Sequence, residues 1–520
     1  MRTIWHSLAW KEWHEHKWKL AAVNAVVIAI TAGMYCAFKS PDLFELTAAM
    51  AFGCLIPLTI YVAASDATAE RSRHTAPLLA ALSVPSWKAG IAKLVFGSIT
   101  CISPLLPALF IVTWMRPLPR PFAGNLVEDT LTFIWRGQQL KVAPWIWCIL
   151  SALLDASVVA SVYFWTAATA ARRKDEVSGT AVAIATVGSL WTICMFVANL
   201  LRQLALGSWR GPAMIISSAL PGGLTYVVTE HLPMPILIAA AISGISAHYA
   251  LAVWFIRHFT SAVQEREWPS LWHRTHSNSA WLAPPRRSKF SAIAWKQFRE
   301  IGPPLTAGIT AVTCVIVAIV LCNRVEYSEP RRFLELIACA AVYVGFIVAI
   351  TVGIGLLLND LGPQLNTFWR SRPINSDLWF WTRFCLVPLA LFFLTALPMA
   401  LVAWWALPSL DEIGNWIQPE FIVIVSVLLC LYASAVAMTC LLRNAIYAAV
   451  LSIALLVAPF VVLWLIWLLV APLGFVPAPR SGAMGSFSNS AAFAILVVTT
   501  TAATILSWLA VRNDWGRKNV

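Results

Sequence analysis

Apolar runs long enough to cross a membrane recur throughout this chain of 520 residues, and they constrain its fold more than any other feature. A helix that crosses a bilayer needs about 20 mostly apolar residues. On that criterion the sequence predicts twelve spans, near Leu20–Phe38, Leu46–Ala64, Ile91–Met115, Trp145–Ala171, Val177–Leu201, Ile236–Ile256, Leu305–Leu321, Leu334–Leu358, Trp379–Leu407, Ile417–Leu442, Ala445–Ala471 and Ala491–Val511. The sequence lacks the short alternating strands of an outer-membrane barrel. We therefore expect an all-α polytopic membrane protein.

Composition and charge support a membrane protein with both termini in the cytoplasm. Hydrophobic residues make up 59% of the chain and charged residues 12%, against about 25% charged in a soluble domain. The net charge is +13, and most of the 37 lysines and arginines fall on the side of the two termini. The positive-inside rule makes that side cytoplasmic, in a plasma membrane or bacterial inner membrane. Because no basic stripe stands on a soluble domain, nucleic acid is not an expected partner.

A short motif occurs twice, each time directly before a predicted span. It reads AWKEWHE at Ala9–Glu15 and AWKQFRE at Ala294–Glu300. In a helix Trp5, Leu8, Ala9 and Trp13 would share one face, with Lys11, Glu15 and Lys19 opposite. We therefore predict an amphipathic helix on the membrane surface at residues 3–19, and a second at 290–301. The aromatic residues expected to contact lipid are Trp5, Trp10, Trp13, Phe290, Trp295 and Phe298.

The repeated motif predicts an internal duplication in which the two halves point the same way. Six crossings return the chain to its starting side, so the halves would be related by an axis along the membrane normal. The predicted units are residues 1–259 and 290–520, joined by a polar, basic cytoplasmic linker at 260–289. Chance similarity between two aromatic and basic segments is the alternative explanation of the repeat.

The first cytoplasmic loop of each half carries an amphiphilic stretch that ends in Ser-x-Pro. Exposed leucine or aromatic side chains on such a loop favour docking by a partner protein, and a helix resting on lipid headgroups is the alternative. The candidate coupling residues are Glu70, Arg71, Thr75, Leu78, Leu79, Leu82 and Pro85 in the first half, and Trp369, Arg370 and Pro373 in the second.

Several well-known motifs are missing from the sequence. GxxxxGK[ST], HExxH, GxSxG and paired Cys/His ligand spacings are all absent. We therefore expect no nucleotide-binding, catalytic or metal-ligating residues in this chain, and we do not expect it to be an enzyme. The energy for any work would come from an ion gradient or from another polypeptide.

The WKEW opening, the six spans and a first loop of the form ER-x-x-x-T…LL-x-x-L-x-x-P resemble the permease subunits of ABC transporters of the type-2 exporter class. The resemblance implies two permease units fused in one chain, each with a coupling helix docked on a separate cytoplasmic ATP-binding subunit, present as two copies or two kinds. ATP and Mg²⁺ would bind that partner, and no cofactor is expected in this chain. The resemblance also implies a short re-entrant segment near Pro212–Pro221. The second half departs from the pattern, because Asn359–Gly362 replaces the Glu-Arg pair.

Two ionisable residues, Asp155 and His248, lie inside predicted spans. Such residues point to a substrate path, and a hydrogen bond within the bundle or a span that begins later is the alternative. The leading hypothesis is an exporter permease that works by alternating access, driven by the separate ATPase. A gradient-driven secondary transporter with parallel repeats is the alternative, although it would need more intramembrane carboxylates than Asp155. A membrane enzyme is disfavoured because no catalytic constellation is recognisable.

Overall fold

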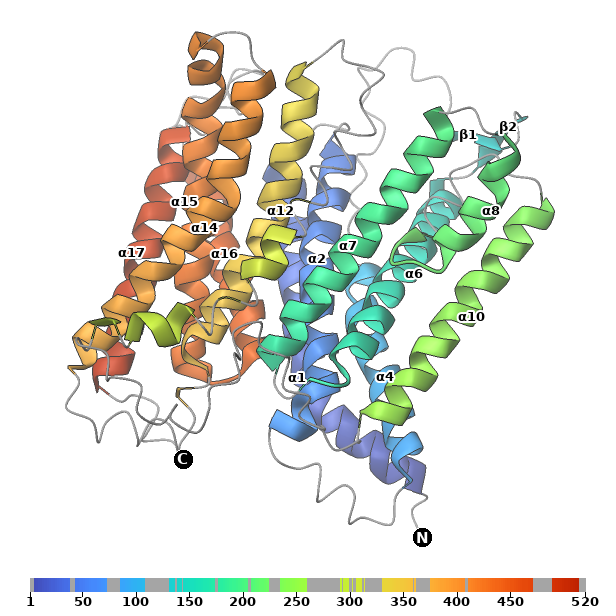
Figure 1. Ribbon diagram of the computed structural model, residues 1–520, viewed down its shortest axis with the longest axis horizontal. Helices are drawn as coiled ribbons and strands as arrows, with labels where there is room; N and C mark the ends of the chain where they lie inside the picture. The colour runs from blue at the N-terminus through green and yellow to red at the C-terminus, as the bar shows by residue number, and fades with distance from the viewer. Residues whose placement is uncertain are drawn as a thin grey trace, which may run out of the picture.

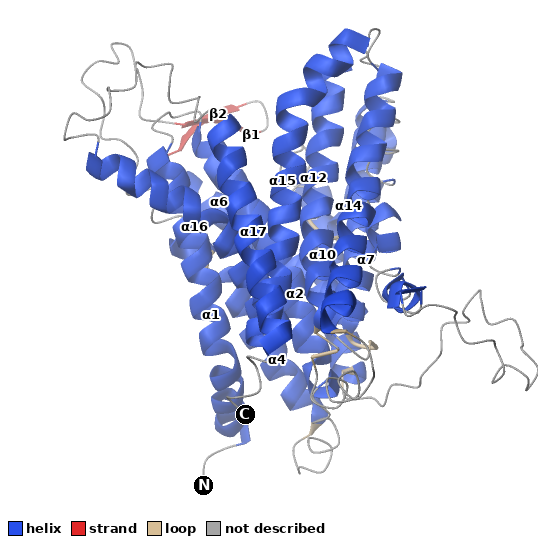
Figure 2. Cartoon of the chain, turned by 90° about the vertical axis from the view of Figure 1, so that its left-hand side faces the viewer, coloured by secondary structure: helices blue, strands red, loops and turns tan. Residues whose placement is uncertain are grey.

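The apolar runs form long helices that lie side by side in a bundle (Figure 1). A computed structural model describes residues 4–37, 43–72, 85–107, 131–135, 138–142, 144–173, 176–203, 207–223, 234–259, 290–291, 293–298, 302, 305–310, 313, 330–358, 360–361, 375–406, 410–470 and 489–513. Helix α1 (Ile4–Ala37) begins, and helix α17 (Asn489–Asn513) ends, at the same end of the bundle (Figures 1 and 2). We call this the terminal end.

The remaining helices follow the predicted order of spans, except that most of the predicted span Leu305–Leu321 lies outside the described residues. In the first half they are α2 (Leu43–Ser72), α4 (Ser86–Ile102), α6 (Pro144–Ala170), α7 (Glu176–Gln203), α8 (Gly207–Ser218) and α10 (Met234–His258). In the second half they are α12 (Pro330–Leu357), α14 (Ser376–Ala406), α15 (Leu410–Leu442) and α16 (Ala445–Val470). Local signals set some boundaries: the Asn444 side chain accepts hydrogen bonds from the backbone N–H groups of Ile446 and Tyr447 at 3.1 and 3.3 Å, and so caps α16.

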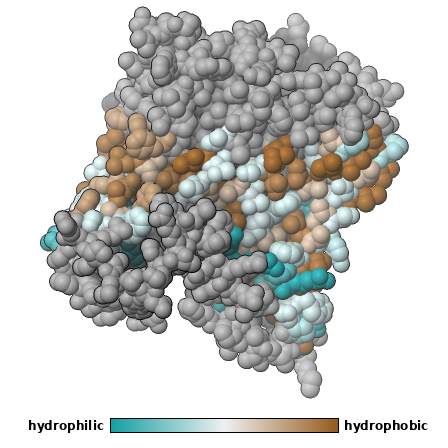
Figure 3. All heavy atoms as spheres, viewed as in Figure 1, coloured by the Kyte–Doolittle hydropathy of each residue, from teal (hydrophilic) through white to brown (hydrophobic). Residues whose placement is uncertain are grey.

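The described helices identify a multi-pass membrane protein. Six are long and apolar enough to cross a membrane: Ser86–Pro107, Leu153–Ala170, Met234–His258, Ser376–Phe393, Val425–Leu442 and Phe493–Asn513. Shorter apolar helical segments lie at Leu55–Thr68, Val344–Leu357 and Ala445–Pro459. Large apolar side chains such as Ile245 of α10 and Val498 of α17 are exposed on outer faces, and Figure 3 shows hydrophobic residues in a band across the middle of one side. Such a band is suited to contact with the lipid tails of a membrane.

Inside the bundle, small residues let helices approach closely. Ala433, Ala435 and Ala437 of α15 are fully buried. A Cβ atom added at Gly353 of α12 would lie 2.8 Å from the Cβ of Ala435 and 3.0 Å from the backbone oxygen of Tyr432. Close approach through small residues is typical of helix pairs in membranes. Small residues therefore allow α12 and α15 to pack closely within the core.

The helix contacts of the second half repeat those of the first. Helix α2 packs against α4, α6 and α7, and α12 packs in the same way against α14, α15 and α16. Helix α10 packs against α4 and α6, and α17 against α14 and α15. Between the halves, α2 contacts α16, α12 contacts α7, and α1 also contacts α16. The α2–α16 and α12–α7 contacts are reciprocal.

Tyr61 of α2 and Thr351 of α12 form a hydrogen bond across the boundary between the halves. Both hydroxyls also lie within hydrogen-bond distance of the Ile347 carbonyl, at 2.6 Å from Thr351 and 3.4 Å from Tyr61. The two residues are 290 positions apart in the chain. Glu70 of α2 and Asp360, just after α12, each pair with the lysine of the repeated motif and are separated by the same interval, so Tyr61 and Thr351 occupy corresponding places in the two halves.

Two features differ from the sequence-based expectation. First, α1 is one continuous helix of 34 residues, so the segment 3–19, predicted as a separate interfacial helix, is the beginning of the first long helix. No Gly or Pro stands near Lys19–Leu20 to break it. Second, a short hairpin accompanies the helices, although the fold is all-α as predicted. Strands β1 (Leu131–Trp135) and β2 (Gln138–Val142) pair antiparallel, with Leu131 opposite Val142 and Trp135 opposite Gln138. Aromatic and β-branched residues on either side of Arg136–Gly137 favour such a hairpin.

Helix α8 occupies part of the predicted re-entrant segment, Pro212–Pro221. It has 12 residues, about 18 Å at a rise of 1.5 Å per residue, which is too short to cross a membrane. It packs against α7 and α10. After it the chain turns at Gly222, whose φ is +72°, and at Gly223, where a Cβ would lie 1.6 Å from the Ser217 backbone oxygen. The two glycines allow a reversal that other residues would strain.

Candidate functional site

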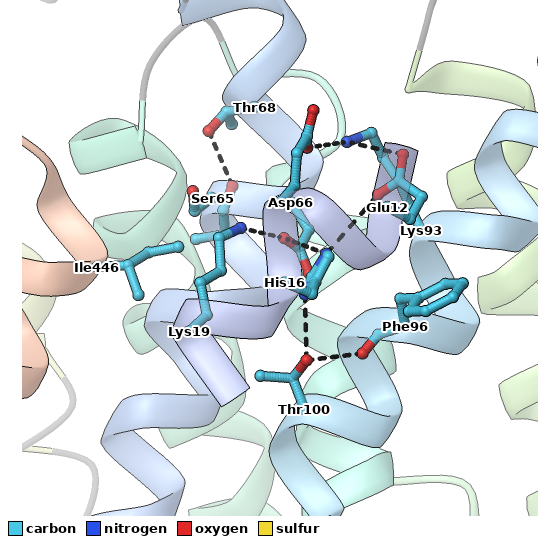
Figure 4. Close-up of polar contacts among 12 residues, drawn as sticks. Glu12, His16, Lys19, Ser65, Asp66, Thr68, Lys93, Phe96, Thr100 and Ile446 are labelled. Atoms are coloured by element: carbon cyan, nitrogen blue, oxygen red, sulfur yellow. Dashed lines mark hydrogen bonds and ion pairs between the residues drawn. The ribbon is translucent and has the colours of Figure 1, made fainter. Parts of the chain in front are cut away.

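Charged side chains are buried at the terminal end of the bundle, where α1 meets α2 and α4 (Figure 4). The members of this group, called the α1 cluster below, are Lys11, Glu12, Glu15, His16, Lys19, Asp66, Glu70 and Lys93. Charged residues are rarely buried unless they are paired, and in a membrane protein they mark functional positions. This cluster is therefore the leading candidate for a functional site.

Helix α1 directs ionisable residues inward on consecutive turns. Glu12, His16 and Lys19 are 0%, 2% and 4% exposed, because their spacing of four and three residues places them on one face. Trp10 and Trp13 on the outer face are 56% and 46% exposed. A surface helix of a water-soluble protein has the opposite arrangement, with its apolar face directed inward and its polar face outward. The arrangement suits a helix whose outer side faces lipid and headgroups.

Lys93 of α4 is the centre of one side of the cluster. Its ammonium nitrogen lies 3.2 Å from Glu70 Oε1, 3.6 Å from Glu15 Oε2 and 3.7 Å from Glu12 Oε1. Lys11 shares the Glu70 carboxylate at 2.8 Å. Lys93 is only 1% exposed, so it depends on these carboxylates to offset its lost hydration. One lysine thereby holds α1 and α2 against α4.

Asp66 of α2 is the centre of the other side. It accepts a hydrogen bond from the Lys19 ammonium at 3.1 Å and another from the Tyr163 hydroxyl of α6 at 3.2 Å. The Tyr163 hydroxyl also lies 3.3 Å from the Lys93 carbonyl. At Gly97 of α4, a Cβ would lie 1.9 Å from the Tyr163 hydroxyl oxygen. The glycine makes the space in which α6 reaches the cluster.

Glu12 and His16 have the least complete hydrogen bonding in the α1 cluster. Neither carboxylate oxygen of Glu12, nor Nε2 of His16, has a hydrogen-bond partner among the described residues. Burial raises the pKa of Glu12 above its ordinary 4.5, although the positive charges of Lys93 and Lys11 oppose the change. Burial lowers the pKa of His16 below its ordinary 6.5, although the Asp66 charge opposes this. Both residues are therefore biased toward their neutral forms.

A smaller cluster occupies the corresponding place in the second half. The Lys296 ammonium lies 2.7 Å from Asp360 Oδ1, as Lys11 does with Glu70. The Arg383 guanidinium contacts both Asp360 and Gln297. Tyr432 of α15 donates a hydrogen bond to the Phe384 carbonyl at 3.0 Å, next to Arg383, much as Tyr163 meets Lys93. In the repeated motif Gln297 takes the place of Glu12.

The predicted coupling residues have different environments. Glu70 was expected on a docking surface, but it is buried and paired with Lys11 and Lys93. Pro85 is exposed and directly precedes α4, and the backbone of Arg71 belongs to the last turn of α2. The other predicted coupling residues lie outside the described residues: Thr75, Leu78, Leu79, Leu82, Trp369, Arg370 and Pro373.

The remaining predicted residues all lie in described helical segments. The interfacial aromatic residues are all exposed: Trp5, Trp10, Trp13, Phe290, Trp295 and Phe298. His248 of α10 donates from Nδ1 to the Gly244 carbonyl at 2.6 Å, and its Nε2 accepts from the Ser161 hydroxyl of α6 at 2.7 Å. Asp155 is half-buried on α6. His248 therefore joins two helices by hydrogen bonds, as the alternative reading of its position predicted.

The sequence reading did not identify the α1 cluster as a buried site. A signal was present: Glu12, His16 and Lys19 follow helical spacing, and Asp66 and Lys93 stand at the borders of apolar runs. Among the described residues, no three His, Cys, Asp or Glu side chains come together as a metal site. No protein-family model matches the chain, and the search of curated proteins found no match.

Proposed function

We propose that this protein is the membrane-spanning permease of an ABC-type exporter, with two six-span units in one chain and a separate ATP-binding subunit. The observation that carries the proposal is the reciprocal contact between the halves. Helix α2 of the first half contacts α16 of the second, and its counterpart α12 contacts α7, the counterpart of α16. The corresponding residues Tyr61 and Thr351 contact each other. A two-fold axis between equivalent parts produces this pattern, because a residue near the axis contacts its own counterpart.

The common direction of the two units supports parallel repeats. Helix α2 ends beside the α1 cluster, and Asp360 follows α12 in the second cluster. The second cluster also lies near the terminal end, because the indole N–H of Trp508, close to the end of α17, donates to Asp377 of α14 at 2.8 Å. The axis that relates such units runs along the membrane normal. Rocking of one unit against the other about this interface would open a substrate path between them on alternate sides.

The terminal end is the proposed cytoplasmic side, where an ATP-binding subunit would dock. Helices α2 and α12 end at this end of the bundle, and most of the predicted coupling residues follow them in the sequence. The charge clusters lie beside the ends of these two helices. A partner that moved this region would therefore act on the first helix of each unit through Lys93, which contacts Glu12 and Glu15, or through Arg383, which contacts Gln297.

A gradient-driven transporter is the second candidate, and the α1 cluster is the observation in its favour. Glu12 and Asp66 add buried carboxylates beyond Asp155, which a proton-coupled mechanism needs. The second half has Gln297 in place of Glu12, so ion coupling of this kind would involve one unit only.

The decisive experiment is purification from native membranes in mild detergent, with ATPase activity as the readout. We expect the protein to co-purify with an ATP-hydrolysing subunit, and we expect the triple variant L78D/L79D/L82D to lose it, because charges abolish apolar docking. A control places two apolar-to-aspartate substitutions at the opposite end of the bundle, L131D/F133D in β1, and should retain the activity.

Two outcomes contradict the proposal. One is purification without ATPase activity together with substrate uptake into liposomes driven by a proton gradient alone, which would favour the second candidate. The other is full retention of the ATPase activity by the triple variant, because three charges should abolish an apolar docking surface.

A further inference from the structure

The tautomer of His16 is fixed by its hydrogen-bond partner on α4. The Thr100 hydroxyl donates its single hydrogen to the Phe96 carbonyl at 2.8 Å, so it can only accept from His16 (Figure 4). His16 Nδ1 lies 3.1 Å from the Thr100 oxygen and is therefore the protonated nitrogen. In a neutral ring this leaves a bare lone pair on Nε2.

That lone pair faces two carboxylates. His16 Nε2 is 3.7 Å from Glu12 Oε2 and 3.5 Å from Asp66 Oδ1. Lys19 donates to Asp66, but no donor among the described residues reaches Glu12 Oε2 or His16 Nε2. Glu12 Oε2, Asp66 Oδ1 and His16 Nε2 are therefore three buried acceptors that lie close together. No hydrogen lies between Glu12 Oε2 and His16 Nε2, and such a contact is unfavourable where water is excluded.

Among the described residues of the α1 cluster, the negative groups outnumber the positive ones by one. Three lysines, Lys11, Lys19 and Lys93, lie among the four carboxylates of Glu12, Glu15, Asp66 and Glu70. A metal ion would meet three ammonium groups and would need several oxygen ligands. A proton needs only the two facing acceptors, and it supplies the missing hydrogen bond.

We propose that Glu12 and His16 form a proton-binding site in which one proton is shared between Glu12 Oε2 and His16 Nε2. The charged and titratable groups around this site come from α1 and the helices packed against it. They are Lys11, Glu15 and Lys19 on α1 itself, Asp66 and Glu70 on α2, and Lys93 and Cys101 on α4. Helix α16 also packs against α1, and its residues Ala445–Val470 include no acidic, basic or histidine side chain. The site does not depend on either transport mechanism proposed above.

Occupation of the site would change how α1 is held. With the proton bound, Glu12 and His16 form a hydrogen bond along α1, and Lys93 is left to Glu15 and Glu70. Without it, the Glu12 carboxylate turns to Lys93 and Lys11, which strengthens the contact between α1 and α4. In the second half Gln297 cannot ionise, so that unit keeps one state. The protein thus carries a proton-responsive unit beside an unresponsive one.

Infrared difference spectroscopy of the purified chain in lipid nanodiscs, without ATPase or substrate, tests the site. Titration toward neutral pH should remove the band of one protonated carboxyl group, and E12Q should abolish that signal. Glu15 lies one turn away and is only partly buried, so E15Q is the matched control and should retain it. Persistence of the band in E12Q overturns the proposal, whatever the transport experiments show.

A second measurement covers the case in which E12Q does not fold. Nitrogen NMR of ¹⁵N-histidine-labelled protein, with the His16 signal assigned from H16Q, reports which ring nitrogen carries hydrogen. An Nδ1-protonated ring that shifts together with the carboxyl titration supports the site. An Nε2-protonated neutral ring contradicts it, because His16 would then donate to the carboxylates without any added proton.

Discussion

Lys93 is the side chain on which most of the α1 cluster depends. It is fully buried and faces the carboxylates of Glu12, Glu15 and Glu70. Removing one partner of a buried ion pair costs about 3–5 kcal/mol, because the other charge is left unpaired. We therefore expect K93M to lower the thermal unfolding temperature strongly, measured by intrinsic fluorescence in detergent.

Lys93→Arg is the matched control. The second half has Arg383 at the corresponding position, where it contacts Asp360 and Gln297. An arginine at position 93 keeps the charge, so K93R should remain close to the wild type. If K93M and K93R unfold alike, the charge of Lys93 does not hold the cluster together.

The pH dependence of stability should carry the signature of His16. Because burial lowers its pKa below 6.5, the folded protein binds fewer protons at this residue than the unfolded chain does in the window just below that value. Stability from His16 is therefore complete above pH 6.5 and is lost as the pH falls toward the folded-state pKa, by about 1.4 kcal/mol per pH unit. We expect H16Q to flatten the fall in unfolding temperature below this pH.

His14 provides the comparison for this titration. It is on the same helix but exposed, so H14Q should leave the pH profile unchanged. A profile that flattens equally in both variants, or in neither, would show that His16 is not the group that titrates.

Little of this residue-level chemistry could be predicted from the sequence. Lys11, Glu15 and Lys19 were placed on a water-facing side of α1 because charged faces usually are solvated. The structure buries Lys19 and brings Glu12 and His16 inward, because α2 and α4 supply Asp66 and Lys93 as partners. Those partners are distant in the chain, so a helical pattern alone does not reveal them.

At the scale of the helices, Gly97 determines how closely α4 and α6 approach. An added Cβ would lie 1.9 Å from the Tyr163 hydroxyl oxygen and 2.5 Å from Asp66 Oδ2. G97A should therefore displace Tyr163 and lower the unfolding temperature, and Y163F in the same chain should restore part of the loss, because the clashing oxygen is gone. Gly302 has nothing within 4 Å of an added Cβ, so G302A is the neutral comparison. Equal effects of G97A and G302A would exclude a packing role for Gly97.

The helices themselves were largely predictable, because an apolar run of spanning length has few other structures in a membrane. The boundaries of the helices and the structure of the loops between them were less predictable. The continuity of α1 through Lys19–Leu20 was missed because a change in composition was read as a boundary. The hairpin of β1 and β2 was missed because its two five-residue strands lie in a loop between spans. Helix α8 lies where the family resemblance implied a short re-entrant segment.

At the scale of the molecule, the repeated motif predicted two halves but not how they meet. Val177 of α7 and Ile446 of α16 are separated by the same interval as Tyr163 and Tyr432, so they correspond. A Cβ at Gly355 of α12 would lie 2.9 Å from Val177 Cγ1, and Figure 4 shows Ile446 directed toward Ser65 and Lys19. The position of Val177 beside α12 and the position of Ile446 beside α2 are therefore equivalent in the two halves. Their partners are known only once the helices are packed.

Disulfide trapping in native membranes, in a cysteine-free background, tests the central claim most directly. Two parallel units about one axis predict that Y61C/T351C cross-links at the axis, and that V177C/G355C and S65C/I446C cross-link to a similar extent on either side. Y61C/V498C, which pairs the axis with an exposed site on α17, should not cross-link. Cross-linking of only one of the two reciprocal pairs, or failure at the axis, would contradict the account.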